Sequence, residues 1–116
     1  MTFKQDILVR IGGDFAVNAD EATKILTDAI KDNDHLNTDR IIRCIVYLAQ
    51  GDLTDLANYI ESAINDTRDV IFWAEYSGIT GSKKPKQIRD FTKTFDKAYS
   101  KNTETSSNPF RFNIGT

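Results

Sequence analysis

The sequence predicts an all-α protein: a compact bundle of four to five short helices with a basic amphipathic C-terminal helix and a flexible tail. Three observations lead to this prediction. Apolar residues recur at helical spacing in successive segments of the first 76 residues. Residues that cap or break helices separate these segments. A β-strand over residues 7–11 would need a partner strand, and none is evident.

Two helices are expected first, over residues 3–11 and 19–32. Both carry an apolar face repeating every three to four residues. Gly12-Gly13 is expected to end the first helix, because glycine readily adopts the left-handed conformation of a helix stop. In the linker that follows, Phe15 and Val17 are expected to pack against the core.

A third helix is expected to begin near Asn37 or Thr38 and to end at Gln50. Its apolar residues cover a wide arc: Ile41, Ile42, Ile45, Val46, Leu48 and Ala49. A helix that is apolar over so much of its surface is contacted from more than one side. We therefore expect it to be the central helix of the bundle.

The segment 51–76 predicts a helical hairpin that follows the third helix directly. Gly51 ends that helix, and Asp52 can cap the next one at once. The new helix covers about 53–64, and Asp66 or Thr67 can cap a further helix over 67–76. A single uninterrupted helix over 53–76 is the alternative. A break is favoured, because Asn-Asp-Thr is typical of caps and not of helix interiors.

The remaining chain differs in composition from this predicted body, residues 1–77. Residues 78–85 are rich in glycine and polar residues, which is typical of a linker. Residues 86–101 recover helical periodicity, with Phe91 and Phe95 on the apolar side, and predict a basic amphipathic helix. The segment 102–116, rich in serine, threonine and asparagine, is expected to be disordered.

Charge divides the chain into two unequal parts. Residues 1–76 hold seven lysines and arginines against fourteen aspartates and glutamates, a net charge of −7. Residues 77–116 hold eight against three, a net charge of +5. Such asymmetry predicts a contact between opposite charges. The basic helix then docks on the acidic body of its own chain or of a sister chain, or it contacts a nucleic acid or an anionic surface.

Few residues in the sequence support catalytic or metal chemistry. Cys44 is the only cysteine and lies among apolar residues, which predicts a buried, unreactive thiol and a cytoplasmic location. His35, the only histidine, falls in a predicted exposed loop. We expect no cofactor, no metal site and no membrane span. The acid pairs of 52–69 fall where helix capping alone would place them.

Two further motifs were considered for nucleotide or nucleic-acid binding. The run 78–84 combines glycines, hydroxyls and lysines, but its spacing is wrong for a phosphate loop. Residues 53–73 resemble a helix-turn-helix in outline. However, the segment 52–75 carries one arginine against six acids, which would repel a phosphate backbone. Because Trp73 lies at helical spacing beside Val70 and Ala74, it is expected in the core, with Phe72 and Tyr76 on another side of the helix.

The leading hypothesis is a small cytosolic, non-catalytic module for protein–protein interaction or regulation, which binds a protein partner or forms a homo-oligomer. The candidate partner-binding residues are Phe72, Tyr76, Lys86, Arg89, Phe91, Lys93, Phe95 and Lys97. The first alternative is a nucleic-acid-binding protein that uses the basic arm, including Lys83, Lys84 and Lys101. The second is a metal-dependent enzyme that uses helical carboxylates.

Overall fold

The computed structural model describes residues 3–76 and 86–99 of the 116-residue chain. Over these residues the fold is all-α, as predicted. The helices are α1 (Gln5–Phe15), α2 (Ala19–Asp32), α3 (Asp39–Ala49), α4 (Leu53–Asn65), α5 (Thr67–Glu75) and the single turn α6 (Phe95–Ala98). Two short 3-10 turns, η1 (Ala16–Asn18) and η2 (Asp34–Leu36), join the first three helices. The predicted linker 78–85 and tail 102–116 lie outside the described residues.

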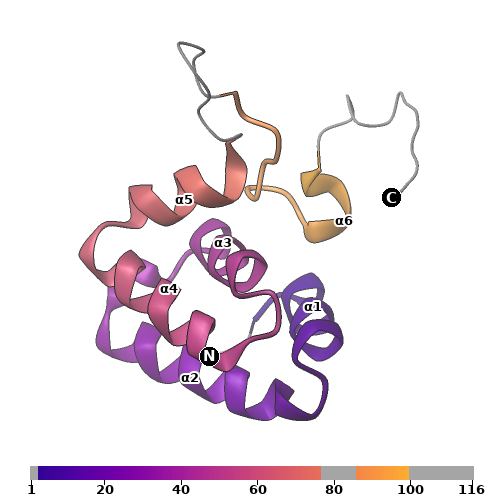
Figure 1. Ribbon diagram of the computed structural model, residues 1–116, viewed down its shortest axis with the longest axis vertical. Coiled ribbons are helices and arrows are strands. Elements are labelled where there is room, and N and C mark those ends of the chain that lie inside the picture. Colours follow the sequence, from indigo (N-terminus) through magenta and orange to yellow (C-terminus); the bar gives the residue numbers. More distant parts are fainter. Residues whose placement is uncertain (1–2, 77–85, 100–116) are drawn as a thin grey trace.

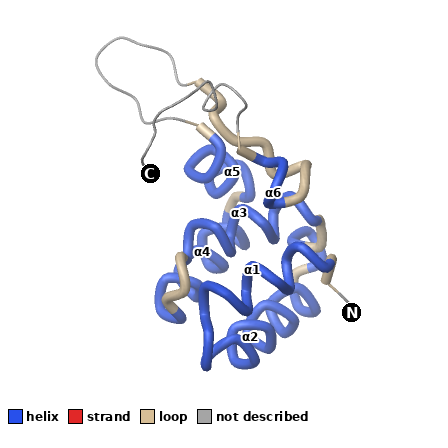
Figure 2. The backbone as a smooth tube through the Cα atoms, turned by 90° about the vertical axis from the view of Figure 1, so that its right-hand side faces the viewer, coloured by secondary structure: helices blue, strands red, loops and turns tan. Residues whose placement is uncertain are grey.

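The α3 helix is the centre of the bundle, with α1, α4 and α5 packed around it (Figure 1). Seven of its eleven residues are buried. This confirms the prediction from its wide apolar arc. In Figure 2, α2 lies at one end of the molecule and α5 at the other, with α3 between them. Other helices therefore lie on opposite sides of α3.

Side-chain caps begin three of the helices where the sequence predicts them. The hydroxyl of Thr38 accepts a hydrogen bond from the Ile41 N–H at the start of α3. Asp52 caps α4 and Asp66 caps α5 in the same way. The cap at Asp66 shows that 53–76 is two helices and not one. Each cap satisfies a backbone donor that the helix itself leaves unpaired.

The first helix does not end at Gly12-Gly13, contrary to the prediction, but continues to Phe15. The positive φ angle falls on Ala16, at 50°, and not on either glycine. Ile7, Ile11 and Phe15 are spaced four residues apart and all three are buried. Burial of Phe15 on this apolar row stabilises the extra turn and outweighs the poor helix propensity of glycine.

The expected packing of the segment after α1 is only half correct. Phe15 is buried, but it belongs to the helix and not to a linker. Val17 is 95% exposed on η1. With the helix extended to Phe15, η1 turns the chain directly into α2 and leaves this side chain in solvent.

The predicted helix over 86–101 is also wrong for most of its described length. Helix is limited to Phe95–Ala98, and residues 86–94 are extended or in turns. We call the described segment 86–99 the strap. It crosses the C-terminal end of α5 and reaches α1, and isolated antiparallel bridges join Tyr76 to Gln87 and Arg89 to Tyr99 (Figures 1 and 2). The N–H groups of Ile88, Arg89, Phe91 and Phe95 donate to Glu75 or Asp6 on other elements, and these bonds replace hydrogen bonds of a helix.

The apolar core runs continuously from α1 to the strap. It contains residues of every helix, including Phe91, Phe95 and Ala98 of the strap. The strap is therefore part of the folded body and not a separate arm. Among the described helices, none is long and apolar enough to cross a membrane.

Candidate functional site

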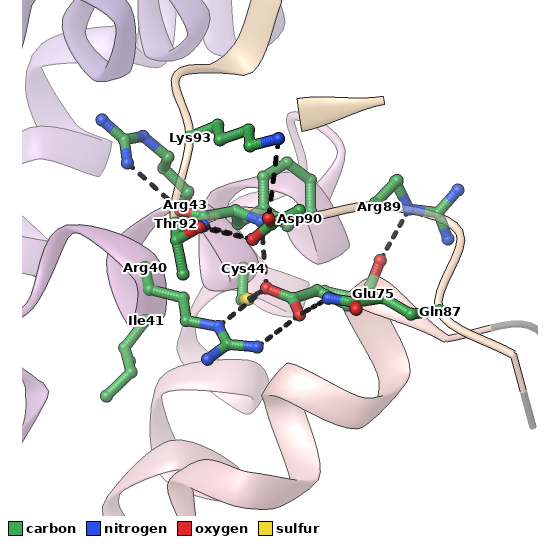
Figure 3. Close-up of polar contacts among 12 residues, drawn as sticks. Arg40, Ile41, Arg43, Cys44, Glu75, Gln87, Arg89, Asp90, Thr92 and Lys93 are labelled. Atoms are coloured by element: carbon green, nitrogen blue, oxygen red, sulfur yellow. Dashed lines mark hydrogen bonds and ion pairs between the residues drawn. The ribbon is translucent and has the colours of Figure 1, made fainter. Parts of the chain in front are cut away.

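A buried carboxylate at the end of α5 joins the strap to the body. Glu75 has no exposed surface. Arg40 on α3 donates two hydrogen bonds to it, Nη2 to Oε1 at 2.6 Å and Nε to Oε2 at 2.9 Å (Figure 3). This paired geometry is the strongest way to neutralise a buried carboxylate. The guanidinium of Arg40 therefore provides the buried carboxylate of Glu75 with a charged partner.

The remaining bonds of the Glu75 carboxylate go to the strap. Gln87 Nε2 donates to Oε1 at 2.9 Å, and the Phe91 N–H donates to Oε2 at 3.0 Å. The Glu75 carbonyl also accepts hydrogen bonds from the N–H groups of Ile88 and Arg89. One residue thus binds four strap donors, and this fixes the path of residues 87–91 across α5.

A second carboxylate repeats this arrangement four residues further along the strap. Arg43 donates from Nε and Nη2 to the two oxygens of Asp6 on α1, at 2.9 and 3.1 Å. The Phe95 N–H donates to Asp6 Oδ2 at 3.0 Å, and Arg43 Nη1 donates to the Phe91 carbonyl at 3.1 Å. The strap is therefore held at Phe91 and Phe95 by two arginine–carboxylate pairs.

The protonation of Asp6 is linked to this arrangement. Burial alone would raise the pKa of the Asp6 carboxyl. The hydrogen bonds from Arg43 and from the Phe95 backbone outweigh burial, together with the charge of the guanidinium, and hold the pKa below its usual range. Asp6 is consequently a carboxylate at neutral pH and needs its partners to remain in place.

Cys44 lies beside Glu75 and is fully buried, as predicted. Its Sγ is 4.0 Å from Glu75 Oε2. Burial raises the pKa of the thiol, and the neighbouring carboxylate raises it further. Because the thiolate is the nucleophilic form, this cysteine is chemically inert at neutral pH.

Three of the predicted partner-binding residues face the body of their own chain. Phe91 is fully buried and packs against Tyr47 at 5.3 Å between ring centroids. Phe95 is buried and packs edge-on against Phe91. Arg89 donates to the Ala74 carbonyl at 2.6 Å (Figure 3). Its guanidinium lies 4.6 Å from the centre of the Tyr47 ring.

The three predicted strap lysines have a different environment. Lys86, Lys93 and Lys97 are exposed. The ammonium of Lys93 is 4.0 Å from Asp90 Oδ2, at the limit of an ion pair. These residues carry the positive charge of the strap at the surface. The nucleic-acid alternative therefore remains a prediction from charge, and Lys83, Lys84 and Lys101 lie outside the described residues.

Trp73 is 46% exposed, so the expectation that it belongs to the core is wrong. The buried residues of α5 are Val70, Ala74 and Glu75. Because α3 and the strap both contact that side of the helix, Trp73 is left on the outer side. Its ring packs edge-on against the half-buried Tyr59 of α4, at 6.2 Å between centroids.

The two remaining predicted residues are Phe72, on α5, and Tyr76, which directly follows the helix as its C-cap. Their rings stack at 5.5 Å with an angle of 17° between planes, and both side chains are half-buried. They share the outer surface of α5 with Trp73, next to it around the helix. We call Tyr59, Phe72, Trp73 and Tyr76 the aromatic surface.

Metal-binding chemistry is not evident in the part of the chain that the structure describes. Within residues 3–76 and 86–99, no three histidine, cysteine or carboxylate side chains come together in a way that could hold a metal ion. His35 is exposed, as predicted, and its Nε2 lies 3.1 Å from the Ile64 carbonyl. A pocket near α2 and η2 is lined by Thr27, Ile30, Lys31, Asp34 and Asn37. It lies apart from the strap residues described above.

Sequence reasoning missed the two arginine–carboxylate pairs. Arg40 and Arg43 are the only basic residues of the largely apolar α3 and are spaced three residues apart. Two arginines on a central, largely apolar helix are a usable signal for ion pairs with buried carboxylates, since arginine is almost never buried alone.

No family model, curated protein or solved structure matches this chain.

Proposed function

We propose that this protein is a small cytoplasmic module for protein–protein interaction, without a catalytic step, and that it binds its partner through the aromatic surface. The observation that carries the proposal is the exposure of Trp73, the only tryptophan of the chain, which is 46% exposed beside other aromatic rings. Tryptophan and tyrosine are enriched in protein interfaces and dominate their binding energy.

The environment of the strap supports this choice of surface. Phe91 and Phe95 are buried in the core, so in the docked state they serve the fold of this chain. Of the predicted aromatic partner-binding residues, Phe72 and Tyr76 keep part of their surface in solvent. Together with Trp73, they form an apolar surface of the kind that marks a contact site.

The charged groups of the interior support a role without catalysis. The carboxylates of Glu75 and Asp6 are occupied by arginines and strap N–H groups. Groups that are saturated in this way position the chain and have no open side for a substrate. The cytoplasmic part of the proposal is supported by the single, buried cysteine, since secreted chains of this size usually depend on disulfides.

An unbiased peptide-display selection against the full-length protein tests this proposal. The expected result is a set of binding peptides that lose affinity for the Trp73→Ala variant by about tenfold or more, as for the truncation of a central interface aromatic. The matched control is Val17→Ala, another exposed apolar residue, which should bind the same peptides unchanged. Peptides that bind Trp73→Ala as well as the native chain would refute the proposal.

A further inference from the structure

The aromatic surface lies on an acidic part of the structure. The α4–α5 hairpin, residues 52–75, carries six carboxylates and one arginine, Arg68. Arg68 is held by Asp66, with Nη2 to Oδ2 at 2.9 Å. The exposed carboxylates of Asp55 and Asp69 form no ion pair with any basic side chain of residues 3–76 or 86–99. Negative charge thus remains available beside the aromatic rings.

Each of the two packed rings has one of these carboxylates a single helical turn away. Asp55 precedes Tyr59 by four residues on α4, and Asp69 precedes Trp73 by four residues on α5. Residues four apart are neighbours on a helix surface. Asp69 lies on the side of its ring nearer the α4–α5 junction, whereas Asp55 lies on the side of Tyr59 away from it. The two carboxylates therefore flank the ring pair.

This combination of groups selects a cation. The face of an aromatic ring attracts an ammonium or guanidinium group, and a carboxylate beside it adds to the attraction. An acidic partner would be repelled. A wholly apolar partner would displace water from the two carboxylates without replacing the lost interactions.

We propose that the aromatic surface binds a cationic amphipathic segment of another protein. Its apolar side chains cover the ring pair, and lysines or arginines on either side reach Asp55 and Asp69. The inference rests on the proposed function above and specifies the chemistry of the partner. It identifies the complementary charges as the source of selectivity, since opposite charges across an interface discriminate between partners.

A set of three designed helical peptides tests this inference with the full-length protein. They share one pattern of leucines, and their polar positions are all lysine, all glutamine or all glutamate. Binding is followed by the emission of Trp73, the only tryptophan, which shifts to shorter wavelength when the ring is covered. We expect the lysine peptide to bind most tightly and to lose affinity as salt is raised, because exposed charges are screened.

The variants Asp55→Asn and Asp69→Asn should each lower the affinity for the lysine peptide by about two- to fivefold, the range of an exposed ion pair. The affinity for the glutamine peptide should stay the same. The control Asp20→Asn removes an exposed acid from the first turn of α2 and should change neither. Equal binding of the lysine and glutamine peptides, or no binding of the lysine peptide, would overturn the inference.

These outcomes are separate from those of the display selection. Selected peptides that depend on Trp73 but are neutral or acidic would leave the proposed function intact and overturn the cationic partner. Self-association of the protein that is lost in Trp73→Ala, measured by sedimentation, would also overturn it, because the occupant would then be a second copy of this chain.

Discussion

Arg40 and Glu75, on helices α3 and α5, form an ion pair in which the half-exposed guanidinium donates to both oxygens of the buried carboxylate. The same carboxylate accepts the Phe91 N–H of the strap. The helical body and the strap therefore share one charged group. A buried ion pair adds little net stability compared with apolar packing, but removal of one partner leaves an uncompensated charge. The pair is thus a point at which the docking of the strap can be tested.

We predict that Glu75→Gln destabilises the protein by about 1.5–3 kcal/mol, the range for hydrogen bonds to a charged group, because the carboxylate is buried while Arg40 stays partly in solvent. All four groups that bind the carboxylate are donors, so the amide nitrogen of glutamine would face at least one of them without a bond. Urea denaturation followed by circular dichroism measures the change. Glu61→Gln, at an exposed position of α4, is the control and should change stability by less than about 0.5 kcal/mol. Equal stability of the two variants would contradict the prediction.

We predict that Asp6 makes the protein sensitive to acid. Its folded-state pKa is lowered, so its stabilising contribution is complete above the unfolded-state pKa of about 3.9. The contribution declines as the pH falls through this value and then through the lowered pKa of the folded state. Melting temperatures measured from about pH 7 down to about pH 3 should fall more steeply for the native chain than for Asp6→Asn. Parallel curves would show that Asp6 does not contribute to the acid transition.

The features that the sequence predicts correctly depend on short segments. Asp52 and Asp66 accept hydrogen bonds from N–H groups three and two residues further along, so a few residues suffice to identify the caps. The apolar arc of α3 is likewise contained in eleven residues. These interactions are decided locally, and the helix boundaries they predict are correct.

The features that the sequence does not predict depend on distant partners. Asp6 bonds to Arg43, 37 residues away, and to Phe95, 89 residues away. The strap is periodic enough for a helix, but these donors and acceptors hold it extended. The exposure of Trp73 has a related cause, because strap packing on α5 favours burial of Glu75. Helical spacing predicts which residues share a face, but not which face a distant segment covers.

We predict that the glycines of α1 and the glycine before α4 respond oppositely to alanine. At Gly12 a new Cβ would meet no atom within 4 Å, and the residue is helical. Gly12→Ala should therefore stabilise the protein by about 0.5–1 kcal/mol. At Gly51 the φ angle is +82°, and a Cβ would lie 2.2 Å from the Asp14 carbonyl oxygen.

Gly51→Ala should therefore destabilise the protein by more than about 1–2 kcal/mol, the cost of the left-handed conformation alone. Chemical denaturation measures the stability of both variants. Gly13→Ala is a second test on α1, because a Cβ at Gly13 would also meet no atom within 4 Å. A loss of stability in Gly12→Ala would show that α1 ends at the glycines after all. A neutral Gly51→Ala would show that the α3–α4 turn can relax.

The division between core and contact surface gives the last prediction. Phe91 is fully buried in the core, whereas Trp73 is 46% exposed. Phe91→Ala should destabilise the protein by about 3–5 kcal/mol, because it removes a large side chain and leaves a cavity. Trp73→Ala should cost less, about 1–2 kcal/mol, since nearly half of the side chain is already in solvent and its ring contact is one edge-on pair with Tyr59.

The two variants should be compared by circular dichroism, because Trp73→Ala removes the only tryptophan and with it the fluorescence signal. Equal and large losses would place Trp73 in the core and remove the basis for the aromatic surface as a binding site. A small loss for Phe91→Ala would show that the strap contributes little to the folded body. We expect a large loss of stability in Phe91→Ala and a smaller one in Trp73→Ala. This result would show that the strap is needed for folding, because Phe91 holds it in the core. It would also show that Trp73 contributes less to the fold and is therefore available to bind a partner.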